Sequence, residues 1–79
     1  NGYISGVVHF GIFVELEDYF IEGLVHLTRL PQDHYEFWEK KHTLAGRHEK
    51  RVFRLGDRVR VRAEAASLER RQVDFSLVQ

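Results

Sequence analysis

The chain has 79 residues and a mass of 9.4 kDa, which allows one domain but not a core with a separate large active-site cleft. Hydrophobic residues make up 43% and charged residues 30%, with zero net charge, so intrinsic disorder is excluded. Cysteine is absent, which excludes disulfides and cysteine-based sites, and no apolar run reaches the ~20 residues that a membrane span needs.

Residues 2–17 are expected to form two strands, because glycines punctuate a run of β-branched and aromatic residues. An alternation with a period of two predicts a buried face made of three residues, Ile12, Val14 and Leu16. Phe13 then lies on the opposite face together with Glu15. Gly6 and Gly11 indicate a bulge or a sharp bend in this segment.

Three further strands are expected along the chain. Residues 21–26 form a short, nearly continuous apolar run, and a clear alternation over residues 59–65 predicts a half-buried fourth strand. Residues 55–57 are typical of the turn that leads into it. The fifth strand, residues 73–77, follows a connection over residues 67–71.

The strand signal stops between the third and fourth strands. Pro31 is expected near the first turn of a short helix, and Gly46 ends the segment. Aromatic packing is expected from three residues, Tyr35, Phe37 and Trp38. We therefore expect residues 31–52 to form an irregular, partly helical insertion.

These elements predict an all-β fold, a five-stranded antiparallel OB-fold barrel with the insertion between its third and fourth strands. Closure removes the sheet edges that a small domain cannot cover otherwise. An SH3-like barrel is the structural alternative. We expect residues 1–79 to form a single domain. Because the chain lacks methionine and starts at Asn1, we expect it to be a piece of a longer protein.

Phe13 is the most informative residue, because an aromatic ring on the polar face can stack on a nucleobase. Phe10 precedes the bend at Gly11, which brings its ring beside Phe13, and Tyr3 is expected to extend this platform. The alternative is that Phe10 is tucked into the barrel end and Phe13 is covered by the insertion. His26 ends the third strand and serves either as a cap bonded to backbone or as a partner for a base or phosphate.

Charge is distributed unevenly along the chain. Residues 9–39 carry seven acids and one base, whereas residues 47–62 carry seven bases and two acids. A basic segment indicates an anionic partner. The alternative is that the two halves neutralise each other across neighbouring strands.

The chain has no motif for catalysis or metal binding. It lacks a nucleophile elbow, a phosphate-binding glycine loop and a cluster of Asp residues suited to paired magnesium ions. The five histidines show no closely spaced pair of the kind that metal sites use. We therefore expect no catalytic residue, no metal ligand and no cofactor in this chain.

Two motifs resemble a known family. Residues 2–16, GYISGVVHFGIFVEL, resemble the opening of an S1 domain, an OB-fold RNA-binding module with the pattern Gly-x-Val-x-x-Ile-x-x-Phe-Gly-x-Phe-Val. Residues 21–30, IEGLVHLTRL, match its second motif, Glu-Gly-Leu-Val-His-x-Ser. Further similarity to the S1 domain of the ribonuclease II/R family covers residues 33–37, 44–46, 53–61 and 73–77. The insertion favours the ribonuclease R branch.

The resemblance implies which residues contact RNA. The family's two phenylalanines and its histidine fall on Phe10, Phe13 and His26. An acid and a base of the family pattern are replaced by Ser67 and Gln72, and the basic residues close enough to compensate are Arg70 and Arg71. His34 and Trp38 stand where that branch commonly has a tyrosine and an acid.

The expected function is to bind single-stranded RNA by stacking and by Arg and Lys contacts to phosphate. The resemblance implies a parent enzyme that is a processive, hydrolytic 3′-to-5′ exoribonuclease, whose catalytic domain, with divalent metal such as Mg²⁺, lies outside this chain. We expect a cytoplasmic monomer that contacts the parent's other domains and no membrane. The alternatives are an S1 module of a translation or transcription factor, or a protein-interaction barrel that docks through its insertion.

Overall fold

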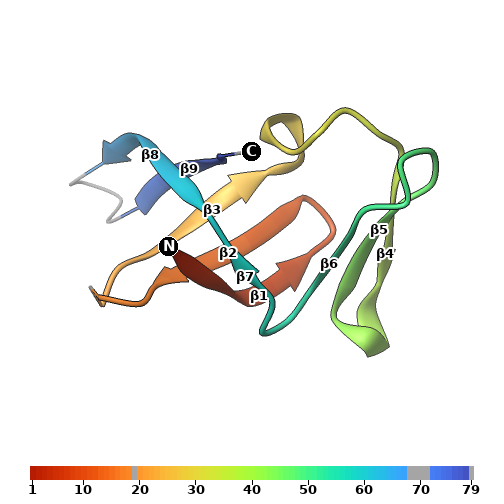
Figure 1. Ribbon diagram of the computed structural model, residues 1–79, viewed down its shortest axis with the longest axis horizontal. Helices are drawn as coiled ribbons and strands as arrows, with labels where there is room; N and C mark the ends of the chain where they lie inside the picture. The colour runs from red at the N-terminus through yellow and green to blue at the C-terminus, as the bar shows by residue number, and fades with distance from the viewer. Residues whose placement is uncertain (19, 68–71, 79) are drawn as a thin grey trace.

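The computed structural model describes residues 1–18, 20–67 and 72–78, and the side chains of these residues other than 65–67 and 72. Within them the chain forms nine strands and two three-residue 3-10 helices (Figure 1). The strands are β1 (Gly2–Val8), β2 (Gly11–Leu16), β3 (Glu22–His26), β4 (Tyr35–Trp38), β5 (Thr43–Gly46), β6 (Val52–Arg54), β7 (Arg58–Val59), β8 (Val61–Ser67) and β9 (Gln72–Leu77). The 3-10 helices are η1 (Leu27–Arg29) and η2 (Glu39–Lys41).

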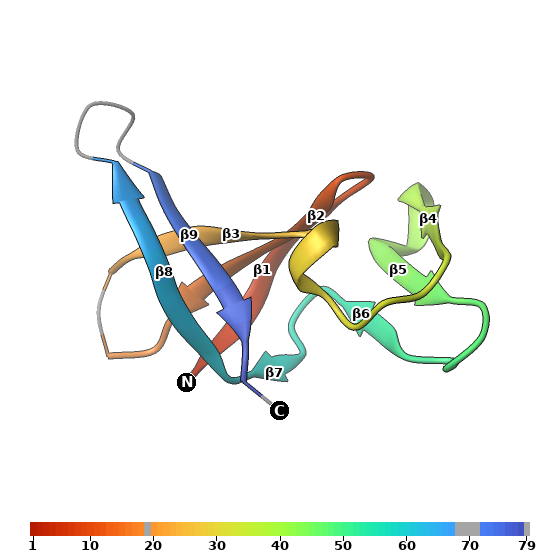
Figure 2. The same cartoon turned by 90° about the horizontal axis from the view of Figure 1, so that it is seen from above.

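Six strands form one curled sheet in the order β7-β1-β2-β3-β9-β8. Its two edge strands, β7 and β8, are separated in the chain by Arg60 alone, so the sheet curls into a half-barrel whose edges meet at this residue (Figure 2). The β1–β2 pairing shifts register between Ile4 and Gly6, which confirms the bulge predicted there. The all-β class is confirmed and is consistent with an OB-fold.

Two details of the expected barrel differ from the structure. The expected fourth strand is divided at Arg60 into β7 and β8, so the described residues have six strands in this sheet and not five. The sheet is also not wholly antiparallel, because β9 lies between β3 and β8 and runs parallel to β3, with Leu24 beside Asp74.

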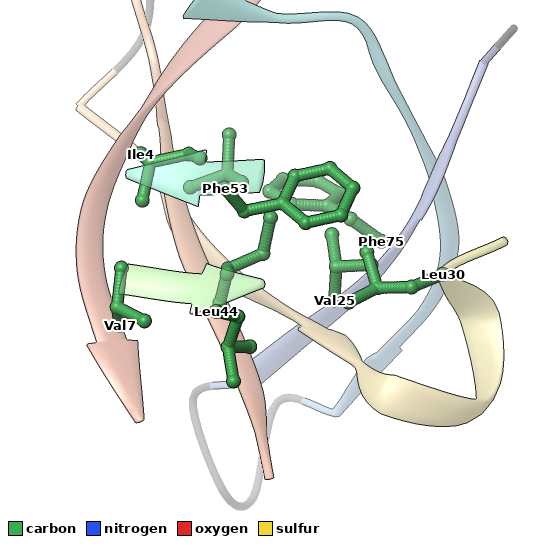
Figure 3. Close-up of a cluster of buried hydrophobic side chains, with 9 residues drawn as sticks. Ile4, Val7, Val25, Leu30, Leu44, Phe53 and Phe75 are labelled. Atoms are coloured by element: carbon green, nitrogen blue, oxygen red, sulfur yellow. The ribbon is translucent and has the colours of Figure 1, made fainter. Parts of the chain in front are cut away.

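The core lies inside the curled sheet (Figure 3). Ile12 and Val14 are fully buried, as the alternation predicts, whereas Leu16 is only partly buried. Phe75 of β9 is 1% exposed and its ring lies against Gly23, where a Cβ would be 2.6 Å from Cε2 of the ring. The missing side chain of Gly23 in β3 therefore provides the space for the ring of Phe75.

The insertion is a second sheet, and the expectation of an irregular, partly helical segment is wrong. Strands β4, β5 and β6 pair antiparallel in that order, and the only helical turn between residues 31 and 52 is the three-residue η2. The physical reason is that Tyr35 and Phe37, two residues apart in β4, both pack against the core. Leu44 and Phe53 join the core of the first sheet, so the insertion packs on the half-barrel (Figure 3).

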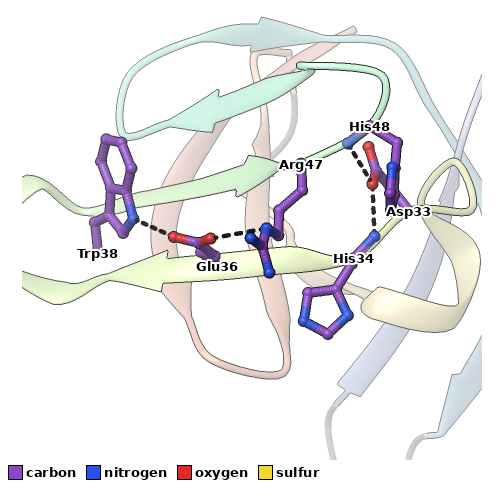
Figure 4. Close-up of polar contacts among 6 residues, drawn as sticks. All are labelled: Asp33, His34, Glu36, Trp38, Arg47 and His48. Atoms are coloured by element: carbon purple, nitrogen blue, oxygen red, sulfur yellow. Dashed lines mark hydrogen bonds and ion pairs between the residues drawn. The ribbon is translucent and has the colours of Figure 1, made fainter.

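Asp33 holds the start of the insertion to the loop between β5 and β6. Its carboxylate accepts hydrogen bonds from the backbone amides of His34 at 2.6 Å and His48 at 3.0 Å (Figure 4). It also accepts one from the backbone amide of Glu49 at 2.8 Å. Because the Asp33 carboxylate is bonded to the amides of this loop, it does not serve as the N-cap of a helix after Pro31. The chain continues as strand β4 instead.

Candidate nucleic-acid interface

The outer face of β2 and β3 carries the predicted platform. In the antiparallel register Gly11 is opposite His26 and Phe13 is opposite Leu24, so the side chains of Phe13, Leu24 and His26 share the face that points away from the core. Their neighbours Ile12 and Val25 are both fully buried. Phe13 is therefore outward-facing, as the alternation predicts.

Three rings meet at one end of this face. The centroid of Phe10 lies 6.4 Å from that of Phe13, with the planes at 83°, and 6.3 Å from that of His26, with the planes at 33°. Phe10 keeps 36% of its surface exposed, and Phe13 is partly exposed. His9 adds an edge contact to Phe10 at 5.2 Å. These side chains form an aromatic cluster at the surface, which we call the ring platform (Phe10, Phe13 and His26).

Two glycines shape the platform. A Cβ at Gly11 would overlap the carbonyl oxygen of Val25, so this residue allows β2 to approach β3 closely beneath the rings. A Cβ at Gly6 would lie 3.4 Å from Cδ2 of Phe13, which means that the ring leans over the neighbouring strand β1. The bend that the sequence predicts at Gly11 therefore brings Phe10 beside Phe13.

His26 is both a cap and an exposed ring. Its Nδ1 accepts a hydrogen bond from the backbone amide of Thr28 at 3.3 Å, at the start of η1, and lies 3.2 Å from the hydroxyl of the same residue. When Nδ1 accepts, the neutral imidazole carries its proton on Nε2. Nε2 is then free to donate to a ligand, so the two roles left open by the sequence are compatible.

Tyr3 lies at the other end of the same face, among acids. Its hydroxyl donates to Glu15, the residue opposite it in the register, and Ser5 donates to Glu22 at 2.6 Å. The hydrogen bond to Glu15 is the main cause that raises the pKa of Tyr3. The face therefore has an aromatic end at the ring platform and an acidic end at Tyr3.

Few of the bases are neutralised by the acids. Among the described residues the ion pairs within 4.0 Å are Arg58–Glu17 at 2.8 Å, Arg47–Glu36 at 3.2 Å and Arg29–Glu64 at 4.0 Å. Only two of the seven bases in residues 47–62 therefore pair with a described acid. Among the described residues, the ion pairs that join the acidic and basic segments are therefore Arg58–Glu17 and Arg47–Glu36.

Several predicted residues lie outside what the structure describes. Arg70 and Arg71 lie outside the described residues, and so do the side chains of Ser67 and Gln72. Leu24, by contrast, is a residue of this face that sequence reasoning missed. Gly23, Leu24 and Val25 are all apolar, so alternation does not show which way Leu24 points. Only its pairing with Phe13 shows this.

The described residues contain neither a cluster of metal-binding side chains nor a membrane-spanning helix. In residues 1–18, 20–67 and 72–78 no three His, Asp or Glu side chains gather closely enough to hold a metal ion. No helix in the described part of the chain is long and apolar enough to cross a membrane.

A family model for the S1 RNA-binding domain matches residues 1–77. The chain belongs to the S1 RNA-binding domain family. This S1 domain is 48% identical over 78 residues to ribonuclease R of Escherichia coli (strain K12) and 50% identical over 78 residues to ribonuclease R of Aquifex aeolicus (strain VF5). Each alignment covers 99% of the chain but only 10% and 11% of the relative, respectively.

Solved structures agree with the sequence relatives. The S1 domain matches the apo form of Mycoplasma genitalium RNase R with a TM-score of 0.88 and 28% identity, over 98% of this chain and 12% of that one. The same values hold for Mycoplasma genitalium RNase R in complex with ribose methylated single-stranded RNA. The resemblance to the S1 domain of ribonuclease R is therefore confirmed, and the chain spans about a tenth of its curated relatives.

Proposed function

We propose that this S1 domain binds single-stranded RNA by stacking bases on the ring platform. The observation that carries the proposal is the cluster of Phe10, Phe13 and His26 at the surface, where the ring centroid of Phe10 lies 6.4 Å from that of Phe13 and 6.3 Å from that of His26. Each stacked base contributes about 1–3 kcal/mol without sequence readout, since every nucleobase has a π-face. A structural relative that is bound to single-stranded RNA supports the same class of ligand.

Charge indicates the path that the RNA strand takes across this face. Phosphates are repelled by the acidic end of the face, where Glu15 and Glu22 lie beside Tyr3. The strand therefore leaves the ring platform away from Tyr3, and contacts from Lys and Arg side chains bind its phosphates. The family resemblance also implies Arg70 and Arg71 as basic contacts for the RNA. Such binding is salt-dependent and tolerant of sequence.

The proposed role is to capture RNA and guide its 3′ end toward the catalytic domain of a parent ribonuclease R. In this role the chain alone is a binding module, and hydrolysis with its divalent metal belongs to the rest of the parent. An S1 module of a translation or transcription factor would use the same RNA chemistry. The relatives named ribonuclease R favour the nuclease.

The test is a titration of fluorescein-labelled oligoadenylate with the wild-type chain and with a Phe10→Ala/Phe13→Ala variant. Neither ring belongs to the buried core, so the variant is expected to fold. We expect its RNA affinity to fall at least tenfold at matched circular dichroism. Unchanged affinity would rule out the ring platform.

A further inference from the structure

A second exposed aromatic ring lies on the insertion. Trp38 ends β4 with 45% of its surface exposed, on the outer face of the second sheet, whereas Phe37 before it packs against the core. In the register Trp38 is opposite Thr43, which in turn is opposite Arg54, so a basic side chain lies on the same face. Trp38 is the only tryptophan of the chain.

Polar contacts orient the indole. Its Nε1 donates to Oε2 of Glu36 at 3.3 Å, and Oε1 of the same carboxylate pairs with Nε of Arg47 at 3.2 Å (Figure 4). Arg47 therefore offsets the charge of the carboxylate that accepts the hydrogen bond from the indole. An oriented ring loses less conformational entropy when a ligand stacks on it.

A cation and a hollow lie next to the ring. Nζ of Lys41 lies over the indole, 5.2 Å from its centroid. An open hollow of about 390 Å³ is lined by Trp38, Glu39, Lys40 and Lys41. A π-face beside an ammonium group offers both contacts that a nucleotide needs, one for its base and one for its phosphate.

Charge favours an anionic strand as the occupant. Residues 39–54, which include η2, β5 and β6, carry six bases and two acids. Among the described residues only Arg47 of these bases forms an ion pair. Residues 39–54 are thus a basic segment, and the acidic end of the first sheet repels the phosphates of an RNA strand.

We propose that Trp38 and Lys41 form a second contact for single-stranded RNA, in which a base stacks on the indole and its phosphate pairs with the ammonium group. This proposal rests on the proposed function, because the RNA strand that binds at Trp38 and Lys41 is the one that leaves the ring platform. The insertion then extends the RNA path beyond β2 and β3, and a longer RNA binds more tightly because it reaches both contacts.

The single tryptophan makes the contact directly measurable. Labelled oligoadenylates of about 4 to about 16 nucleotides, the range of site sizes on one OB-fold, are titrated while label anisotropy and tryptophan fluorescence are followed together. We expect the shortest RNA to change anisotropy alone, and longer RNA to quench the fluorescence as well. Saturated anisotropy with unquenched fluorescence at every length would overturn the proposal.

Variants separate the two contacts. Trp38→Ala should weaken binding of the longest RNA about fivefold or more and leave the shortest unchanged, and Trp38→Phe should restore most of the loss. Lys41→Gln should reduce the slope of log affinity against log salt by about 0.7, the value for one phosphate contact on a single strand. Leu55→Ala, at an exposed apolar residue outside the second sheet, is the control.

The outcomes distinguish this proposal from its alternatives. If Phe10→Ala/Phe13→Ala leaves binding intact while Trp38→Ala weakens it, the ring platform fails and the second contact stands. If Trp38→Ala leaves the affinity for every RNA unchanged and abolishes only self-association of the chain, the indole is a protein-docking residue and the second contact is wrong.

Discussion

The ring of Phe13 lies over Gly6 of the neighbouring strand, where a Cβ would be 3.4 Å from Cδ2. That distance is an ordinary contact, so Gly6→Ala should leave the ring in place and the RNA affinity within about twofold of wild type. The branched side chain of Gly6→Val should displace the ring and weaken binding about fivefold or more, by loss of stacking.

The measurement is an RNA titration of both variants beside their thermal unfolding. Valine favours strands, so the fold should survive the larger substitution. Equal RNA affinities for the alanine and valine variants would show that the position of the Phe13 ring does not matter for binding.

His26 combines two roles that different substitutions can separate. His26→Asn keeps a side-chain acceptor for the amide of Thr28 and removes the ring, whereas His26→Ala removes both. We expect the asparagine variant to keep its stability and lose RNA affinity. The alanine variant should lose affinity and also about 1 kcal/mol of the free energy of unfolding, the usual contribution of a cap.

Urea denaturation and RNA titration of the two variants check this prediction. A loss of affinity in the alanine variant alone would mean that the cap, not the imidazole, is what RNA binding needs. The free Nε2 of His26 would then have no part in recognition.

Strands with a clear period of two could be predicted from the sequence. The buried faces around Ile12 and Phe75 follow from alternation, because one face of each strand meets the core. The second sheet could not be read in the same way. Its strand β4 has only four residues, and β6 only three, too few to establish a period. Contacts between distant segments, such as the parallel pair of Leu24 and Asp74, leave no local signal.

The candidate site was predicted in part for the same reasons. Alternation places Phe13 outward, whereas the position of Phe10 was predicted from the bend at Gly11, and the family resemblance implied the same pair. The direction of His26 is set by its pairing with Gly11 across the strands. Neither motif nor alternation indicated that Tyr3 would be bonded to Glu15.

Asp33 should make the insertion sensitive to acid. Desolvation raises the pKa of this carboxyl, but the hydrogen bonds from the amides of His48, Glu49 and His34 outweigh it and lower the pKa below its ordinary value of 3.8. The unfolded chain therefore binds a proton at a higher pH than the folded one. The stabilisation is fully present above about pH 4 and is lost as the pH falls through the folded pKa.

An NMR titration of the amide signals follows this group directly. We expect the amides of His48 and Glu49 to shift together below pH 3.8, while that of Ala45 in the sheet stays constant. Asp33→Asn should remove the transition and lower the melting temperature at neutral pH. Amides that titrate identically in wild type and Asp33→Asn would show that another acid controls this loop.

Gly23 is the position where one methyl group should be most harmful to the fold. Its Cβ would lie 2.6 Å from Cε2 of Phe75 and 2.6 Å from the carbonyl oxygen of Val73, and Phe75 is only 1% exposed. Neither the backbone of β9 nor a ring packed in the core can move aside freely. We expect Gly23→Ala to lower the free energy of unfolding by about 1–3 kcal/mol, the usual cost of overpacking.

Gly6→Ala, which adds the same methyl at an ordinary contact distance, is the matched control in urea denaturation. Equal stabilities of the two variants would mean that β3 and β9 are not packed as closely as the pairing of Leu24 with Asp74 requires.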